Sequence, residues 1–256
     1  MLHSPKPLHT DMLRILYLLY FCLIAFPLFT VCTILCTLVT VIGCSLGGRR
    51  IFAYYPGMIW SKVAIILSGC RIKVQGKEHI RPKQNYVVVA NHQGAFDIFM
   101  MYGHLGIPFR WVMKDGIRKI PFVGLACRYA GFIFVDDRKP SSIQYTMRQA
   151  KKVLSENTSI FIFPEGSRTT NGRMGRFKKG AILMADELDI PLLPVSIEGS
   201  YKTLPIGKVL PRPTLLKLTI HPEMKVSDFG EKPQAFVAAA EAAKRSIASA
   251  LPLEQN

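Results

Sequence analysis

The feature of this sequence that most constrains its fold is a long uncharged segment near the N-terminus. No Asp, Glu, Lys or Arg occurs from Ile15 to Gly48, and most of the side chains there are aliphatic or aromatic. A single helix of that length would be about 51 Å long, whereas the hydrocarbon core of a bilayer is about 30 Å thick. Pro27 lies within the segment and is expected to kink or break such a helix.

Three interpretations of this segment compete. A cleaved signal peptide would have an apolar region of only about 7–15 residues, followed by a small-residue cleavage site. A helix buried in a soluble core is disfavoured, because the uncharged length exceeds what one globular core covers. We therefore expect residues 1–70 to form a membrane-anchoring helical segment. It is either a tilted span followed by an interfacial helix, or a hairpin that enters and leaves the membrane by one face.

Basic residues flank the apolar segment on both sides, and more of them follow it than precede it. Lys6 and Arg14 precede it, and the following ones are Arg49, Arg50, Lys62, Arg71 and Lys73. Because cytoplasmic flanks of membrane segments are enriched in Lys and Arg, we expect the domain that follows to lie on the cytoplasmic side of a membrane.

The overall composition narrows the class of protein further. The chain has 33 Lys plus Arg against 17 Asp plus Glu, a formal charge of +16, and 20% charged residues, too many for a multi-span transporter. A basic chain favours nucleic acid or anionic lipid as partner. No zinc-finger spacing, basic zipper or RNP-type aromatic pattern occurs, so we expect membrane lipids and phosphate-bearing substrates as partners and no nucleic acid. The six cysteines form no C-x-x-C pair, which predicts free thiols and no metal site.

After Arg71, short β-rich runs alternate with helical patterns. This pattern predicts that residues 71–256 form an α/β domain with a mostly parallel central sheet flanked by helices. The expected strands are 86–90, 110–113, 132–135, 159–163 and 192–197, with 215–220 as an edge strand, and the expected helices are 97–104, 117–129, 141–154 and 234–251. Ligands of such sheets bind beyond the carboxyl ends of the strands, which directs attention to the residues after 86–90 and 159–163.

An imidazole and a carboxylate follow the first of these strands. His92 lies just past the strand end, and Asp97 lies five residues later at the start of a helix. At this spacing the carboxylate can bond one ring nitrogen and leave the other as a base that faces the cleft. The alternative is a histidine bonded locally in a turn, with Asp97 as a helix N-cap.

A second polar group follows the strand 159–163, in the sequence Pro164-Glu-Gly-Ser-Arg168. Gly166 permits a positive φ or a close backbone approach, and the planar guanidinium of Arg168 suits phosphate oxygens. Further basic residues follow it at Arg173, Arg176, Lys178 and Lys179, and the alternative reading of the group is a solvated basic loop. Ser167 is not expected to be a hydrolase nucleophile, because the flanking pattern is not G-x-S-x-G.

These two blocks together resemble those of the glycerolipid acyltransferases of the lysophosphatidic acid acyltransferase type. The family's H-x-x-x-x-D block is matched by 91–97, its F-P-E-G-[ST]-R block by 163–168, and its short apolar block around a proline by 192–195. The resemblance covers roughly residues 50–230. Two departures occur: the arginine of the G-x-x-F-[IV]-D-R block is displaced by one position to Arg138, and the residues after Lys114 do not follow the family's pattern.

The resemblance implies an enzyme that transfers a fatty acyl group to the sn-2 hydroxyl of lysophosphatidic acid, giving phosphatidic acid. The donor would be a thioester, acyl-CoA or acyl carrier protein, with no further cofactor. His92 and Asp97 would be the catalytic pair. The acceptor phosphate would be bound by Lys114 and Arg168, in a pocket that Glu165, Gly166 and Ser167 help to form. The alternatives are an acyltransferase for glycerol 3-phosphate or a lyso-ornithine lipid, and a non-enzymatic protein that binds anionic lipids.

Overall fold

The chain folds as an alternating α/β unit preceded by a long N-terminal helix. We describe this fold in a computed structural model for residues 8–136 and 142–255. The helices are α1 (Leu8–Tyr20), α2 (Phe26–Ser45), α3 (Arg49–Phe52), α4 (Tyr55–Leu67), α5 (Phe96–His104), α6 (Val123–Tyr129), α7 (Ser142–Ser155), α8 (Gly180–Glu187), α9 (Ser200–Thr203) and α10 (Gln234–Ala248). The strands are β1 (Arg71–Gln75), β2 (Val87–Ala90), β3 (Phe109–Lys114), β4 (Ile133–Val135), β5 (Ser159–Ile162), β6 (Leu192–Glu198) and β7 (Leu215–Ile220).

In these described ranges the strands form one sheet in the order β1-β7-β6-β2-β5-β3-β4. Every neighbouring pair is parallel except β6 and β7, so the predicted α/β class with a mostly parallel sheet is confirmed. The expectation that 215–220 is an edge strand is wrong. β1 pairs with β7 along its whole length and covers that edge. The alternating pattern of β7 arises because only one of its faces is well buried.

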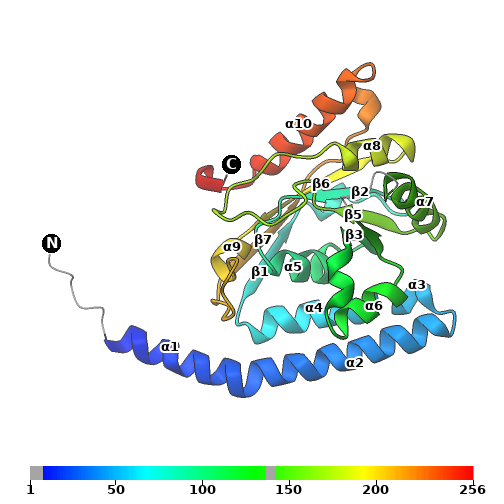
Figure 1. Ribbon diagram of the computed structural model, residues 1–256. Coiled ribbons are helices and arrows are strands. Elements are labelled where there is room, and N and C mark those ends of the chain that lie inside the picture. The colour runs from blue at the N-terminus through cyan, green and yellow to red at the C-terminus, as the bar shows by residue number, and fades with distance from the viewer. Residues whose placement is uncertain (1–7, 137–141, 256) are drawn as a thin grey trace.

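Two hydrophobic cores lie on opposite faces of the sheet, one under α7, α8 and α10 and one under α4 and α5 (Figure 1). Strand β2 contributes to both, since Val87 and Val89 pack on the first core and Val88 on the second. A strand buried on both faces is typical of a parallel sheet covered by helices, and it explains the continuous apolar run of this segment. Because β2 is the middle strand of the sheet, the residues that follow it lie at the middle of the sheet's carboxyl edge.

The predicted helix over 117–129 is interrupted. A short 3₁₀ turn covers Asp115–Lys119, and α6 begins only at Val123. Pro121 removes an N–H donor and holds the residue before it extended, and Phe122 has a φ of 59°. Ser141, expected as the cap of the following helix, lies outside the described residues, as do Asp137 and Arg138.

The uncharged N-terminal segment forms one long helix that runs from α1 to α2 through a π-helical turn at Phe21–Ala25 (Figure 1). The helix is not broken at Pro27, although it bends between α1 and α2 (Figure 1). The π turn directly before Pro27 changes the local hydrogen-bond pattern, so the helix continues past a residue that lacks an N–H. α4 then returns along α2, and the Trp60 Nε1–H donates to Thr33 Oγ1 at 2.9 Å.

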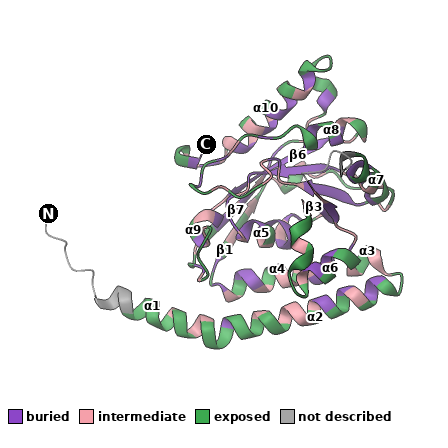
Figure 2. Ribbon diagram, viewed as in Figure 1, coloured by how far each residue is buried: buried purple, intermediate pink, exposed green. Residues whose placement is uncertain are grey.

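Most of this long helix is exposed (Figure 2). Residues Met12–Ser45 are long and apolar enough to cross a membrane, and only 11% of their most apolar window is buried. This low burial excludes the interpretation of the segment as a helix of a soluble core. The exposed apolar side chains continue onto α4 at Ile59 and Ile66.

Candidate active site

The centre of the candidate site is a hydrogen bond between His92 and Asp97. The Nδ1 of His92 lies 2.7 Å from Oδ2 of Asp97, whose side chain is completely buried. The same carboxylate oxygen accepts the backbone N–H groups of Gln93 at 2.6 Å and Gly94 at 2.9 Å. A carboxylate oxygen is an acceptor only, so the His92 Nδ1 must carry the proton and Nε2 is the basic nitrogen.

The turn between β2 and α5 places this pair because several backbone groups fix it. Asn91 bridges β2 to β6: its Nδ2 donates to Ile197 O at 2.9 Å, and its Oδ1 accepts the Ile197 N–H at 2.8 Å. The chain then turns so that Asp97, in the first turn of α5, reaches back to the N–H groups of the turn. The local alternative considered for Asp97, a helix N-cap, is wrong, because Ala95 is the N-cap of α5 and Asp97 accepts N–H groups of the turn that precedes the helix.

The segment after β5 holds His92 from the other side. The imidazole stacks on the ring of Phe163, with centroids 3.7 Å apart and planes 6° from parallel. Oε1 of Glu165 accepts the backbone N–H of His92 at 2.7 Å, and the carbonyl of His92 accepts the N–H of Thr169 at 2.9 Å. The ring of His92 is therefore fixed in plane as well as in tautomer.

Glu165 connects this centre to the basic loop. Its Oε2 accepts the Gly175 N–H at 2.7 Å. Burial raises the pKa of the Glu165 carboxyl above its ordinary value, whereas the two backbone hydrogen bonds act against that rise. Gly166 next to it has a φ of 76°, which confirms the positive φ expected at this glycine.

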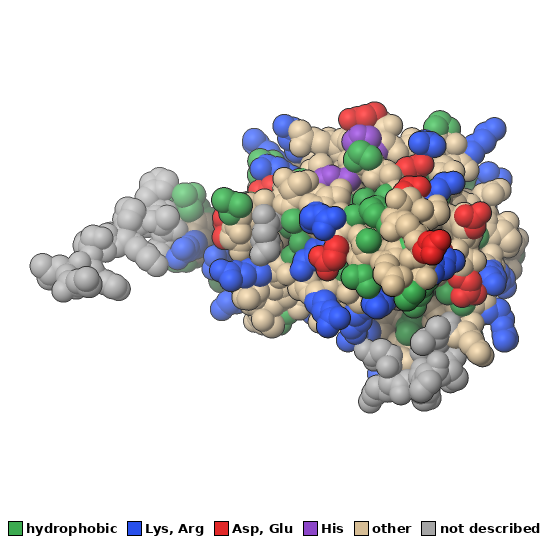
Figure 3. Space-filling model, turned by 90° about the horizontal axis from the view of Figure 1, so that it is seen from above, with side chains coloured by type: hydrophobic (Ala, Val, Ile, Leu, Met, Phe, Trp, Pro, Cys, Tyr) green, Lys and Arg blue, Asp and Glu red, His purple; other side chains and the backbone are tan. Residues whose placement is uncertain are grey.

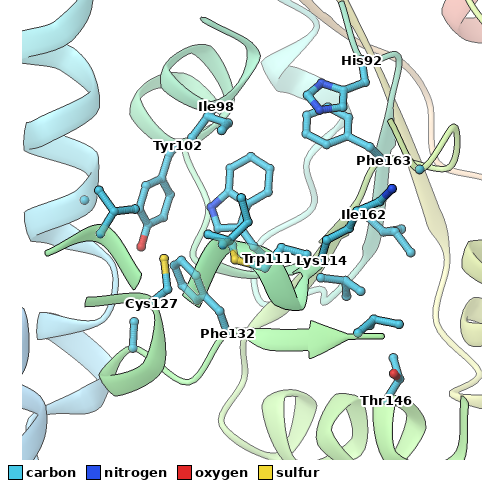
Figure 4. A pocket seen from close by; sticks show the side chains of 18 of the residues that line it. His92, Ile98, Tyr102, Trp111, Lys114, Cys127, Phe132, Thr146, Ile162 and Phe163 are labelled. Carbon is cyan, nitrogen blue, oxygen red and sulfur yellow. The ribbon is translucent and has the colours of Figure 1, made fainter. Parts of the chain in front are cut away.

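A cavity of about 630 Å³ opens beside His92 and extends between the sheet and the N-terminal helices (Figure 4). His92 and Phe163 lie at one end of it, and Cys127 and Phe132 lie at the other, with Trp111 between them. Its walls come from α2, α4, β3, α6, α7 and α8 and are mostly apolar. The long N-terminal helix therefore forms part of the wall of the cavity.

The residues expected to bind substrate line this cavity or the hollow next to it. Lys114, Gly166, Ser167 and Arg168 line the cavity together with His92. Asp97 lies behind the imidazole and does not line it. Glu165 lines a neighbouring hollow that shares Ser167 and Arg168 with the cavity.

Some residues of the site were not singled out from the sequence. Asn91, Phe163 and Gln93 lie within or beside the two blocks, but their roles depend on partners far along the chain. Gln93 is buried, and its Nε2 donates to Oε1 of Gln255 at 2.8 Å. No signal in the sequence links the C-terminal end of the chain to the residue next to His92.

No group of three or more His, Cys, Asp or Glu side chains able to hold a metal ion occurs in the ranges that the structure covers. Within the site itself, the acidic groups Asp97 and Glu165 are engaged by backbone N–H groups and by the imidazole. The described residues of the site therefore provide a base (His92), cationic side chains and an apolar cavity.

Comparisons with known proteins identify the family of the chain. A family described as Acyltransferase matches residues 71–198, half of the chain. The chain is 31% identical over 160 residues to a chloroplastic 1-acyl-sn-glycerol-3-phosphate acyltransferase of Arabidopsis thaliana, a match of 62% of this chain and 44% of that protein. A 1-acyl-sn-glycerol-3-phosphate acyltransferase of Chlamydomonas reinhardtii is 26% identical over 98% of this chain and 73% of its own length.

Among solved structures, the chain is similar to the 1-acyl-sn-glycerophosphate acyltransferase PlsC from Thermotoga maritima. The two share 27% identity with a TM-score of 0.75, over 93% of this chain and 96% of that one. The match therefore includes the N-terminal helices as well as the sheet. Several curated relatives are longer, and the chain spans less than half the length of the Arabidopsis protein.

Proposed function

Since this chain belongs to the acyltransferase family, we propose that it transfers a fatty acyl group from a thioester to the sn-2 hydroxyl of lysophosphatidic acid, giving phosphatidic acid. One observation carries the proposal: the basic nitrogen of the His92–Asp97 pair lies at the mouth of a cavity that joins cationic side chains to an apolar interior. The reaction needs a base to activate the hydroxyl. It also needs cations and an apolar interior, because both substrates combine a fatty chain with phosphate.

The catalytic step follows from the state of His92. An alcohol is a poor nucleophile at neutral pH, so Nε2 removes the hydroxyl proton as the oxygen attacks the thioester carbonyl. The C–O bond forms, the C–S bond breaks, and the thiolate takes up a proton from the imidazolium. Asp97 stabilises that imidazolium through Nδ1–H and keeps the ring in the required tautomer. No protein nucleophile is required.

Cationic groups at the mouth of the cavity orient the acceptor. Lys114 and Arg168 line the same cavity as His92, and the Arg168 guanidinium suits bidentate contacts with a phosphate. Binding the phosphate places the sn-2 hydroxyl at Nε2, so affinity for the headgroup is used for orientation. Gly166 and Ser167 line the same end and leave room for the headgroup.

The apolar part of the cavity accepts the fatty chain that is transferred. Trp111, Phe132 and Cys127 line it, and Trp111 lies between His92 and the end formed by Phe132 and Cys127 (Figure 4). Each buried CH₂ of the chain gains about 0.8 kcal/mol from leaving water. This gain holds the thioester carbonyl at the His92 end of the cavity while the chain occupies the interior.

The exposed apolar face of α1, α2 and α4 supports attachment to a membrane surface. Its side chains lie on the outside of a helix that runs along one side of the domain, and α4 returns antiparallel to α2 (Figure 1). We propose that this helix lies in one leaflet, so that the α/β domain stays on the cytoplasmic side and reaches acceptor lipid at the membrane surface. The basic residues after the segment support this orientation.

A transfer assay tests the proposal. Lysophosphatidic acid and a radiolabelled acyl-CoA are supplied in mixed micelles to the wild type and to the variants His92→Ala and Arg168→Ala. We expect His92→Ala to lose turnover with little change in KM for lysophosphatidic acid, and Arg168→Ala mainly to raise that KM. Wild-type turnover in both variants would contradict the assignment.

The rival functions give different results in the same assay. Transfer to glycerol 3-phosphate or to a lyso-ornithine lipid, with none to lysophosphatidic acid, would identify another acceptor for the same machinery. A non-enzymatic lipid-binding protein would bind anionic vesicles and transfer no acyl group to any of these acceptors.

A further inference from the structure

A second hollow of about 840 Å³ lies next to the active-site cavity. It is lined entirely by the segment 165–179 between β5 and α8, and it shares Ser167, Arg168 and Lys178 with the cavity that contains His92. We call it the basic hollow. A ligand could therefore extend from the active site into it without a break.

The charge of the basic hollow is strongly positive. Arg173, Arg176 and Lys179 line it in addition to Arg168 and Lys178, and no ion pair joins any of these five to an acid within the described ranges. Its one acidic lining residue is Glu165, and both oxygens of that carboxylate already accept backbone N–H groups. The hollow thus has five cationic side chains against one carboxylate, and none of the five forms an ion pair with it in the described ranges.

The backbone that carries these cations is held in place. Buried and exposed residues alternate along it, with Met174 and Phe177 packed into the core beneath α8 and α10 while Arg173 and Arg176 point outward. Its N–H groups are bonded as well: Met174 donates to Gln255 O at 3.0 Å and Lys178 to Pro164 O at 2.9 Å. A site whose backbone is fixed before binding loses less entropy when the ligand binds.

The position of the basic hollow indicates which substrate it serves. The chain between β5 and α8 runs on the α8 and α10 side of the molecule, away from the apolar α1–α2 helix (Figure 1). Lys and Arg side chains are spread over that side, as seen from above in Figure 3. A ligand that reaches the hollow comes from water, whereas the lipid acceptor comes from the membrane.

We infer that the basic hollow binds the phosphate end of the phosphopantetheine arm of the acyl donor. This inference rests on the proposed function. The reaction has two phosphate-bearing substrates, and the structure has two groups of cations that meet at Arg168 and Lys178. The acyl chain of the donor lies in the apolar cavity, its thioester lies at His92, and the arm leaves over Ser167 toward Arg173 and Arg176. Acyl-CoA and acyl carrier protein share this phosphopantetheine chemistry.

Donors with and without phosphate test the inference. Acyl-CoA, acyl-4′-phosphopantetheine, acyl carrier protein and phosphate-free acyl-pantetheine are compared as donors for Arg173→Gln/Arg176→Gln. We expect the ratio of kcat/KM for acyl-CoA to kcat/KM for acyl-pantetheine to fall on the order of tenfold, because two charge-assisted contacts to phosphate are lost. The matched control Arg212→Gln/Arg245→Gln removes two exposed arginines that line neither cavity and should keep the wild-type ratio.

The different donors show which part of the donor the basic hollow recognises. A loss with acyl-4′-phosphopantetheine equal to that with acyl-CoA supports recognition of the shared phosphate. A loss only with acyl carrier protein, an unchanged ratio, or a raised KM for lysophosphatidic acid in place of the donor would overturn the inference. Calorimetric binding of coenzyme A to the wild type and its weakening in the variant do not require turnover, so they test the hollow even if the proposed acceptor proves wrong.

Discussion

Replacing Asp97 by Asn isolates the contribution of one buried charge to the proposed reaction. The Oδ2 of Asp97 accepts three hydrogen bonds, two from backbone N–H groups and one from the imidazole of His92. In the variant, the backbone donors of Gln93 and Gly94 require the amide oxygen at this position, and the NH₂ group takes the place of Oδ1, which has no hydrogen-bond partner. The tautomer of His92 is therefore kept, and only the negative charge is lost.

The size of the effect follows from the geometry. With 2.7 Å between Nδ1 and Oδ2, the two charge centres are about 4 Å apart, and their attraction at an effective dielectric constant of about 20 is about 4 kcal/mol. This attraction exists only when the imidazole is protonated, as it becomes during attack of the hydroxyl. At about 1.4 kcal/mol per tenfold in rate, we expect kcat to fall by about 10³ with little change in KM.

The assay is steady-state acyl transfer to lysophosphatidic acid, with thermal unfolding measured on the same preparations. The control Glu241→Gln removes an exposed carboxylate on α10 and should retain wild-type kcat. Asp97→Ala should lose activity and also destabilise the fold, since two buried N–H groups lose their acceptor. A kcat for Asp97→Asn within threefold of the wild type would refute the proposed role of the charge.

Three further predictions follow from other parts of the structure. Glu165→Gln replaces one acceptor oxygen by NH₂ opposite the Gly175 N–H, so we expect a loss of about 1–3 kcal/mol in the free energy of unfolding, measured by urea denaturation. Cys127→Phe fills the end of the cavity away from His92, so activity with long acyl donors should fall more than activity with short ones, measured over a donor series. Burial, with Lys62 and Lys77 nearby, lowers the pKa of His104 to about 4. Between pH 6.5 and pH 4 the unfolded chain therefore binds a proton at His104 that the folded chain does not bind. Stability should therefore decrease by about 2 kcal/mol as the pH falls from about 6.5 to about 4, after allowance for the partial exposure of the ring, and His104→Asn should lose this part of the pH dependence.

Each of these predictions has its own control. Glu241→Gln is the reference for Glu165→Gln, and equal unfolding free energies in the two variants would contradict the bridging role of Glu165. Cys127→Ala is the control for Cys127→Phe, because it keeps the cavity open. If both variants change the preference for acyl-chain length equally, the filled cavity is not the cause. Parallel pH profiles of wild type and His104→Asn would show that another group accounts for the acid sensitivity.

Hydrophobic periodicity predicted the strands of the parallel part of the sheet because a strand buried on both faces is a continuous apolar run. The same reasoning missed β1, which alternates between exposed and half-buried positions and packs mainly through its pairing with β7. It also placed β7 at the edge, because local pattern contains no information on which distant strand covers it. Pro27 was expected to kink or break the helix, and the π turn before it lets the helix continue.

The sequence by itself determined the class of the fold and indicated the residues of the candidate site. The spacing of His92 and Asp97 and the position of Arg168 after another strand are short-range properties, and parallel strands bring their carboxyl ends to one edge of the sheet. Only the tertiary structure decided which His92 nitrogen is basic, that Phe163 stacks on the ring, and that the long N-terminal helix forms part of the wall of the cavity. These contacts join residues far apart in the chain, and packing of the whole domain selects them.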